Sequence, residues 1–218
     1  GANLAFIPKN IEEFFWSQNG KKNIVESRLG DRPAFSKKIV EDGLTSIVYV
    51  SKPSTLMYRT FEKFEKFANH KNLGPVKQWH LEYGFPEKKF FETYRRFAKA
   101  IVGVGSSLGN DSYFGLTTEF ILLNNPFEDS IQNFVKLKLV YEGRPRKSAQ
   151  VEVFERSDVG DVRITTIKTS DNGIAIVPIK RGSVYLFDAV KLRPAEQSTD
   201  QQAVWETLWA SLMIKIPR

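Results

Sequence analysis

The sequence contains no cysteine and only two histidines among its 218 residues. The lack of cysteine excludes disulfides, thiolate nucleophiles, zinc–thiolate sites and cysteine-ligated iron–sulfur clusters. A catalytic or metal-binding imidazole would have to be His70 or His80. No apolar run reaches the about 18 residues that a membrane-spanning helix needs, so we expect no membrane span.

Motifs of enzymes are also scarce. The sequence has no His-Glu-x-x-His stretch and no phosphate-binding glycine-rich loop. Carboxylates are numerous, but no pair of them stands out by its spacing, as a glycosidase site would require. We therefore expect a protein that is not an enzyme.

The chain is basic, with a net charge of +7, but its cations are spread along the sequence. Nucleic-acid binders usually gather such charge on one face among aromatic residues, so we predict no nucleic-acid partner. Most of the basic clusters fall at turns and strand ends: Lys21/Lys22, Lys37/Lys38, Lys88/Lys89, Arg95/Arg96, Arg144/Arg146/Lys147 and Lys180/Arg181.

The N-terminal part reads as β structure. Residues 13–25 predict a hairpin that turns at Asn19-Gly20, because this dipeptide favours a two-residue turn. Residues 34–40 and 44–50 predict a second hairpin around residues 41–43.

A helical insertion is predicted near residues 60–84. Phenylalanines at 61, 64 and 67 follow a helical spacing, with Thr60 as the N-cap and Gly74-Pro75 as the stop. A second short helix follows and ends at Gly84.

The rest of the chain again reads as strands. Residues 93–104 fit a strand better than a helix, and residues 106–113 form the most linker-like stretch. About seven further strands are the number expected of an immunoglobulin-like or transthyretin-like sandwich. We predict a mainly β fold of two sandwich-like domains: a β-rich domain over residues 1–105 with the helical insertion, and a sandwich over residues 106–218.

Candidate site residues can be named for two chemistries. His70 and His80, with Glu82 beside the latter, are candidate ligands for a transition metal, although lone histidines are more often structural. The basic face of residues 94–99, with Arg96 and Lys99, could meet an anionic ligand, and Glu119 is a further candidate.

Two other functions stay open at this point. A carbohydrate or cell-envelope polymer could bind exposed aromatics such as Trp16, Trp79 or Trp205, although core packing is the better interpretation of the Trp205–Trp209 cluster. An uncharacterised enzyme would need a cleft with perturbed carboxylates or histidines.

Several segments, in this order and spacing, resemble the bacterial domain-of-unknown-function family four-one-nine-eight. The resemblance rests on residues 30–34, 63–74, 94–100, 115–120, 125–127, 143–145, 169–173 and 205–212.

The resemblance implies a periplasmic or secreted β protein made with a signal peptide, without established catalytic residues. Members are often labelled as periplasmic components of nickel or cobalt uptake, so a nickel or cobalt ion and the cell envelope are the implied partners. Lys191 stands where many relatives carry histidine. Gly1 is not a natural start, so we expect a native leader or further segment before it.

Overall fold

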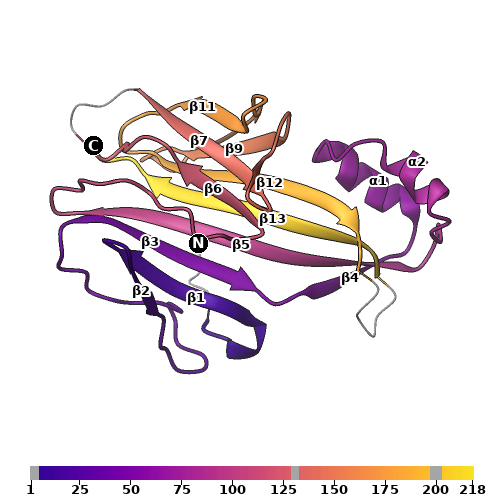
Figure 1. The fold of residues 1–218 in the computed structure, drawn as a ribbon, viewed down its shortest axis with the longest axis horizontal. Helices are drawn as coiled ribbons and strands as arrows, with labels where there is room; N and C mark the ends of the chain where they lie inside the picture. Colours follow the sequence, from indigo (N-terminus) through magenta and orange to yellow (C-terminus); the bar gives the residue numbers. More distant parts are fainter. Residues whose placement is uncertain (1–4, 129–132, 197–202) are drawn as a thin grey trace.

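A computed structural model describes residues 5–128, 133–196 and 203–218. It is built from two β-sheets and two short α-helices (Figure 1). The helices are α1 (Phe61–His70) and α2 (Val76–Glu82). The strands are β1 (Ile11–Gln18), β2 (Lys21–Ile24), β3 (Gly43–Ser51), β4 (Ser54–Tyr58), β5 (Phe90–Val104), β6 (Thr118–Leu122), β7 (Phe134–Tyr141), β8 (Arg144–Pro145), β9 (Gln150–Arg156), β10 (Val162–Lys168), β11 (Ile174–Pro178), β12 (Val184–Pro194) and β13 (Ala203–Lys215).

The larger sheet has nine strands and extends along the whole length of the molecule (Figure 1). Its order is β10-β9-β12-β13-β5-β3-β1-β2, and β4 pairs with the start of β5. At its centre β13 runs parallel to β5, whereas the other neighbours are antiparallel. The last strand of the chain thus joins strands from both halves of the sequence.

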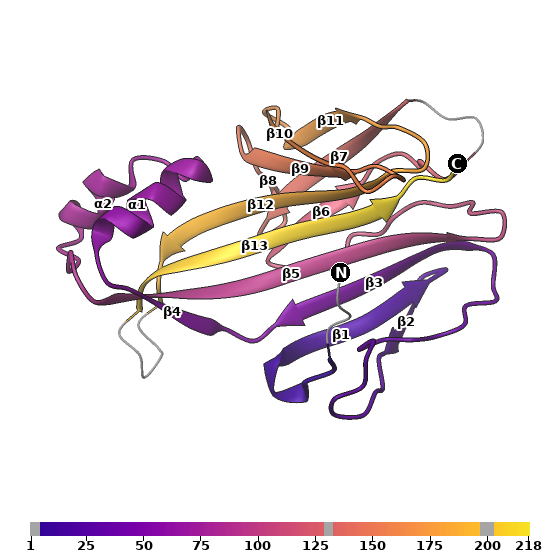
Figure 2. The ribbon, with the colours of Figure 1, turned by 180° about the vertical axis from the view of Figure 1, so that it is seen from behind.

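The smaller sheet, β11-β7-β6 with β8 beside β7, packs on one face of the larger one, which we call the inner face. Side chains of both sheets share one core, including Leu137 and Leu139 from β7 and Phe187 and Leu212 from β12 and β13. The opposite, outer face is turned towards the viewer in Figure 2. The prediction of a mainly β, sandwich-like fold with a short helical insertion is confirmed.

The predicted division of the chain at residue 105 stays a prediction. Residues 105–117 between β5 and β6 contain no strand or helix, as expected of the linker-like stretch. However, the larger sheet includes strands from both sides of this point.

The two helices form a hairpin that packs on the outer face at one end of the larger sheet. Phe64 and Ala68 of α1 and Val76 of α2 are buried against Trp205 and Leu192 of the sheet. The helical spacing of the phenylalanines thus reflects one buried stripe, as predicted. Thr60 stands at the N-cap position, but its side chain makes no capping hydrogen bond.

Of the two predicted N-terminal hairpins, one is confirmed and one is wrong. Gln18 pairs with Lys21 around Asn19-Gly20, and both turn residues have positive φ, as this turn requires. Residues 34–40 form no strand. The reason is that β3 has strand partners at both edges, β1 on one side and β5 on the other, which leaves no edge for a further strand.

Candidate functional site

A notch in the larger sheet, at one edge of β12, forms a candidate site. β9 pairs with β12 only as far as Glu152 opposite Asp188. β12 continues to Pro194, paired there with β13 on its other side. The edge of residues 189–194 therefore has no strand partner on the β9 side within the described chain.

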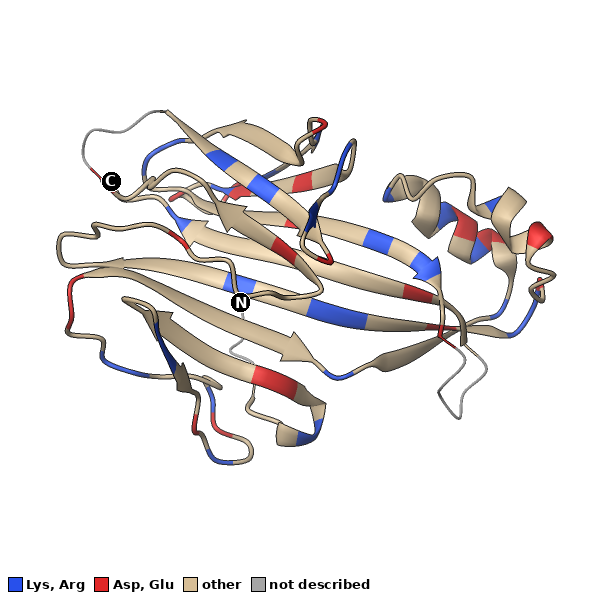
Figure 3. Cartoon of the chain, in the orientation of Figure 1, with Lys and Arg blue, Asp and Glu red and all other residues tan. Residues whose placement is uncertain are grey.

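A pocket of about 650 Å³ lies at this notch, and we call it the basic pocket. The helical hairpin forms its wall on the outer face, and the turn around β8 forms its wall on the inner face. Its lining consists of residues 71–73, 79, 141–142, 144–150 and 190–192. Figure 3 shows Lys and Arg segments at the end of α1, in the β8 turn and along the end of β12, which converge on this place.

The lining carries five cations, Lys71, Arg144, Arg146, Lys147 and Lys191, and a single acid, Glu142. Some of these charges are paired. Lys147 Nζ lies 2.9 Å from Asp171, Lys71 binds two carboxylates, and Glu142 lies 3.4 Å from Arg193. Arg144, Arg146 and Lys191 form no ion pair within the described residues, so the pocket holds an excess of uncompensated positive charge.

Arg146 is the central cation of the pocket. Its backbone N–H donates to the Leu139 carbonyl at 3.0 Å, and its carbonyl accepts a hydrogen bond from the Thr169 hydroxyl, so its position is fixed. Its Nη2 donates to the Val190 carbonyl at 2.8 Å, at the free edge of β12. Its Nη1 is buried and has no hydrogen-bond partner among the described residues.

The surroundings of Arg146 disfavour the charged form of its guanidinium. Burial lowers the pKa of its guanidinium to about 10, because little water reaches the charge. A buried donor without a partner carries its full desolvation cost, and charged groups carry the largest. A bound anion would supply both the missing hydrogen-bond acceptor and the missing counter-charge.

Lys191 adds a second disfavoured cation. Burial lowers the pKa of Lys191, and the nearby Arg146 lowers it further. Its ammonium lies 5.6 Å from the centre of the Tyr141 ring, which attracts it only weakly. An anion near both cations would relieve their mutual repulsion.

Trp79 of α2 gives the pocket an aromatic wall. The indole lies directly against Gly74, where a Cβ would come within 2.4 Å of the Trp79 ring. Gly74 also has φ of +101°, which disfavours any other residue. This glycine therefore lets the turn between α1 and α2 close around the indole.

An ion cluster anchors the helical hairpin beside the pocket. Lys71 Nζ binds Glu152 of β9 and lies 2.9 Å from Asp188 of β12. Burial would lower the pKa of Lys71, but hydrogen bonds to these two carboxylates outweigh it and raise the pKa. Gln150 donates to the His70 carbonyl at 2.8 Å. The end of α1 is thus fixed over the start of β9.

The predicted metal ligands each have another partner. His80 is buried, and its Nδ1 accepts a hydrogen bond from Trp205 Nε1 at 3.0 Å while its Nε2 donates to the Pro86 carbonyl at 3.1 Å. Burial lowers the pKa of His80, which fits this neutral tautomer. His70 Nε2 lies 2.9 Å from Glu152, and Glu82 accepts a hydrogen bond from Gln78.

The predicted ligands therefore do not assemble a nickel or cobalt site within residues 5–128, 133–196 and 203–218. No three histidine, aspartate or glutamate side chains there are grouped so as to hold a metal ion. The predicted metal role stays a prediction.

Of the other predicted site residues, the structure brings Lys99 and Glu119 together. Lys99 Nζ lies 3.0 Å from Glu119 and 2.7 Å from Asp111, and all three side chains are almost fully buried. Glu119 also accepts hydrogen bonds from the N–H groups of Phe114 and Leu116. The cluster fastens the loop after β5 to β6.

Arg96 lies apart from this cluster, on the outer face. Its guanidinium stacks over the Trp209 ring at 5.2 Å. Neither Arg96, Lys99 nor Glu119 lines the basic pocket.

The serine motif of hydrolases occurs once by spacing. Residues 105–109 read Gly-Ser-Ser-Leu-Gly, and Ser107 has φ of 56°, a strained value for serine. A nucleophile elbow is followed by a helix and needs a histidine base. Here no helix follows, and both histidines belong to the helical hairpin at the other end of the larger sheet (Figure 1). The match is therefore not a hydrolase site.

Comparison with known proteins places the chain in a family. The family model described as Domain of unknown function (DUF4198) matches residues 4–192. The chain belongs to the DUF4198 family. No curated protein and no solved structure matches it. The DUF4198 match covers α1, α2, the β8 turn and all but the last residues of β12, and so every residue that lines the basic pocket.

The sequence interpretation missed the residues of this pocket. The sequence places Arg144, Arg146 and Lys147 in a cluster at a turn, and it singles out Lys191 only as a residue that stands where relatives carry histidine. The available signal was a run of three cations within four residues between two strands. That signal does not reveal that Nη1 of Arg146 is buried, because its burial depends on segments far away in the sequence.

Proposed function

We propose that this DUF4198 protein is a non-enzymatic binding protein that holds an oxyanion, a carboxylate or phosphate group of its ligand, in the basic pocket. The observation that carries this proposal is the buried, unpartnered Nη1 of Arg146 among cations without ion pairs. A planar guanidinium matches the geometry of a carboxylate or phosphate, which accepts two parallel hydrogen bonds from it.

The surroundings of Arg146 fit a ligand larger than a free ion. The pocket volume of about 650 Å³ is in the range of small-molecule sites. Trp79 presents a ring for stacking, and Arg144 and Lys191 offer further charge. Acidic sugars of an envelope polymer carry both a carboxylate for the cations and a ring that can stack on Trp79. Such a ligand would satisfy both the carbohydrate and the anion interpretations of the sequence.

A location outside the cytoplasm, in the periplasm or secreted, is part of the same proposal. It rests on the labels attached to the family that the chain resembles. Fractionation of cells that express the native gene checks it: recovery with periplasmic or secreted markers supports the location, and recovery with cytoplasmic markers contradicts it.

Binding is tested by calorimetric titration at pH 7 in a buffer without polyvalent anions. The probes are inorganic phosphate, citrate and a galacturonate trisaccharide. We expect at least one of these probes to bind with a stoichiometry of one. In Arg146→Met the affinity for that probe should fall tenfold or more. Arg181→Met, which changes an exposed arginine outside the lining, is the matched control and keeps the wild-type affinity.

Two results would count against the proposal. One is the absence of heat with every probe. The other is an equal loss of affinity in Arg181→Met, which would show that only the overall charge attracts the anions. The relative affinities for phosphate and the two carboxylates distinguish the ligand classes.

A further inference from the structure

A row of apolar side chains crosses the outer face of the larger sheet. Its members are direct cross-strand partners and therefore lie on one face. From β10 to β1 the row consists of Ile164, Phe154, Leu186, Met213, Ala100, Ile47 and Trp16.

At the end away from the helical hairpin, this face is open within the described chain. Met213 is 48% exposed, and Val102, next to Ala100 on the same strand face, is 46% exposed. Figure 2 shows β5 and β13 in front at this end, with no helix over them. Met213 and Val102 thus leave an exposed apolar patch on this part of the face.

The sheet and the C-terminal segment form a groove of about 580 Å³ here, and we call it the apolar groove. Ala100, Val102, Val184 and Met213 contribute its apolar floor. Phe127 lines the groove at the end of the strands.

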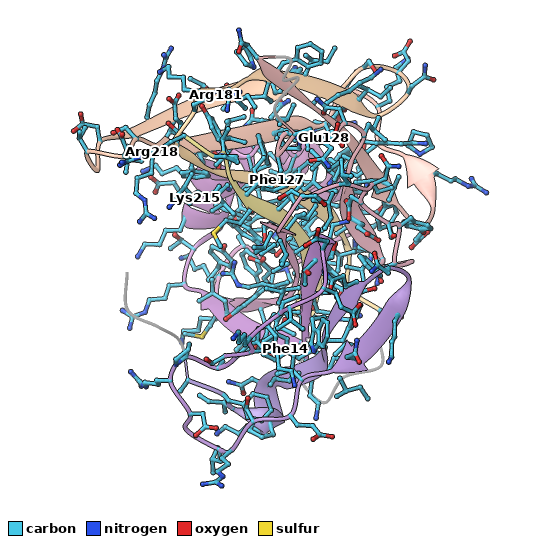
Figure 4. All side chains as sticks on the ribbon, turned by 90° about the vertical axis from the view of Figure 1, so that its left-hand side faces the viewer. Phe14, Phe127, Glu128, Arg181, Lys215 and Arg218 are labelled. Carbon is cyan, nitrogen blue, oxygen red and sulfur yellow. The ribbon has the colours of Figure 1, made fainter. Side chains whose placement is uncertain are left out.

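Every charged residue that lines the apolar groove is positive: Arg156, Lys215 and Arg218. Arg218 has an exposed partner, Asp158, at 3.6 Å. Arg156 and Lys215 form no ion pair within the described residues. Figure 4 looks at this end of the molecule and shows Lys215 and Arg218 on the same side, with Phe127 next to them.

We propose that the apolar groove binds a single acyl chain that carries an anionic head group, as a fatty acid does. The groove has the composition of a small-molecule site, which is mostly apolar with a few polar groups that fix orientation. The lining cations select a negative head group. Every methylene that leaves water on binding favours the complex, so the floor favours a chain over a compact ion. This site is separate from the basic pocket, and the two share no lining residue.

The test is calorimetric titration with dodecanoate below its critical micelle concentration, and with 1-dodecanol as the uncharged analogue. We expect one dodecanoate per chain and at least tenfold weaker binding of dodecanol. Met213→Glu places a negative charge on the floor and is expected to weaken dodecanoate binding at least tenfold. Ile164→Glu changes a somewhat more exposed member of the same row that does not line the groove, and it keeps the wild-type affinity.

Two further variants separate the parts of the proposal. Lys215→Gln should weaken dodecanoate but leave dodecanol unchanged, because it removes only a partner of the head group. Arg146→Met should bind dodecanoate like the wild type, since it changes only the basic pocket. Circular dichroism establishes that each variant is folded.

Three outcomes would overturn the proposal: no binding of dodecanoate to the folded wild type, equal affinity in Met213→Glu and Ile164→Glu, or a wild-type dimer that Met213→Glu converts to a monomer. The last result, read by light scattering, would assign the face to a second copy of the chain.

Discussion

Replacement of Arg146 by methionine separates a binding role of this side chain from a structural one. Burial lowers the Arg146 pKa from its ordinary value to about 10, which at about 1.36 kcal/mol per pKa unit corresponds to a penalty on the order of 3 kcal/mol on the charged form. Methionine removes that penalty. It also removes the hydrogen bond from Nη2 to the Val190 carbonyl, and a bond to a charged group contributes about 1.5–3 kcal/mol. The two effects nearly cancel.

We therefore expect the free energy of unfolding of Arg146→Met to lie within about 1 kcal/mol of the wild-type value in a buffer without polyvalent anions. Urea denaturation followed by tryptophan fluorescence measures it. A saturating anion should then stabilise the wild type, because it binds only the folded state, and should not stabilise the variant. A loss of 3 kcal/mol or more without any anion would show that Arg146 holds the fold together, and the reasoning would fail.

Three other changes follow from the same structure. Gly74→Ala should lose about 1–3 kcal/mol of stability in urea, because its Cβ meets an indole at 2.4 Å, whereas Gly20→Ala, with positive φ but nothing within 4 Å, should lose less. The wild type should lose stability as pH falls below 6.5 towards the lowered pKa of His80, by up to about 1.4 kcal/mol per pH unit, because the unfolded chain takes up the proton first. His80→Gln should lack that component, and identical slopes for both proteins in urea titrations at several pH values would contradict the assignment. Lys99→Met leaves two buried carboxylates without their cation and should cost about 3–5 kcal/mol. The exposed-pair control Lys22→Met should cost less than about 1 kcal/mol, and similar losses in both would refute this account.

The fold could be predicted largely because local signals agreed with it. Asn19-Gly20 specifies its hairpin through backbone conformation alone. The phenylalanines of α1 follow the period of a helix that buries one face.

Long-range pairing was the part that the sequence could not supply. The parallel contact of β13 with β5 joins segments that lie over a hundred residues apart, and no turn signal encodes it. The second predicted hairpin was wrong for the same kind of reason: β3 takes its partners from distant strands, not from residues 34–40.

The candidate site shows the same contrast between local signals and long-range contacts. The predicted site residues Lys99 and Glu119 do contact each other, but burial makes them a structural pair. Arg146 and Lys191 lie in different strand regions and meet only because β9 pairs with β12 no further than Asp188 and leaves the edge of residues 189–194 open. Sequence patterning reports which residues face a core, and it does not report where a sheet edge lacks a partner.

The central claim is that an anion binds Arg146 in the basic pocket, and nitrogen-15 NMR of the arginine side chains tests it most directly. Phosphate or citrate is titrated into the labelled protein, and Arg146→Met assigns the resonances. The account predicts that the Arg146 guanidinium signals shift in a saturable way and that signals of exposed arginines such as Arg181 stay in place. Saturation that moves other arginines and leaves the Arg146 signals unchanged would contradict it.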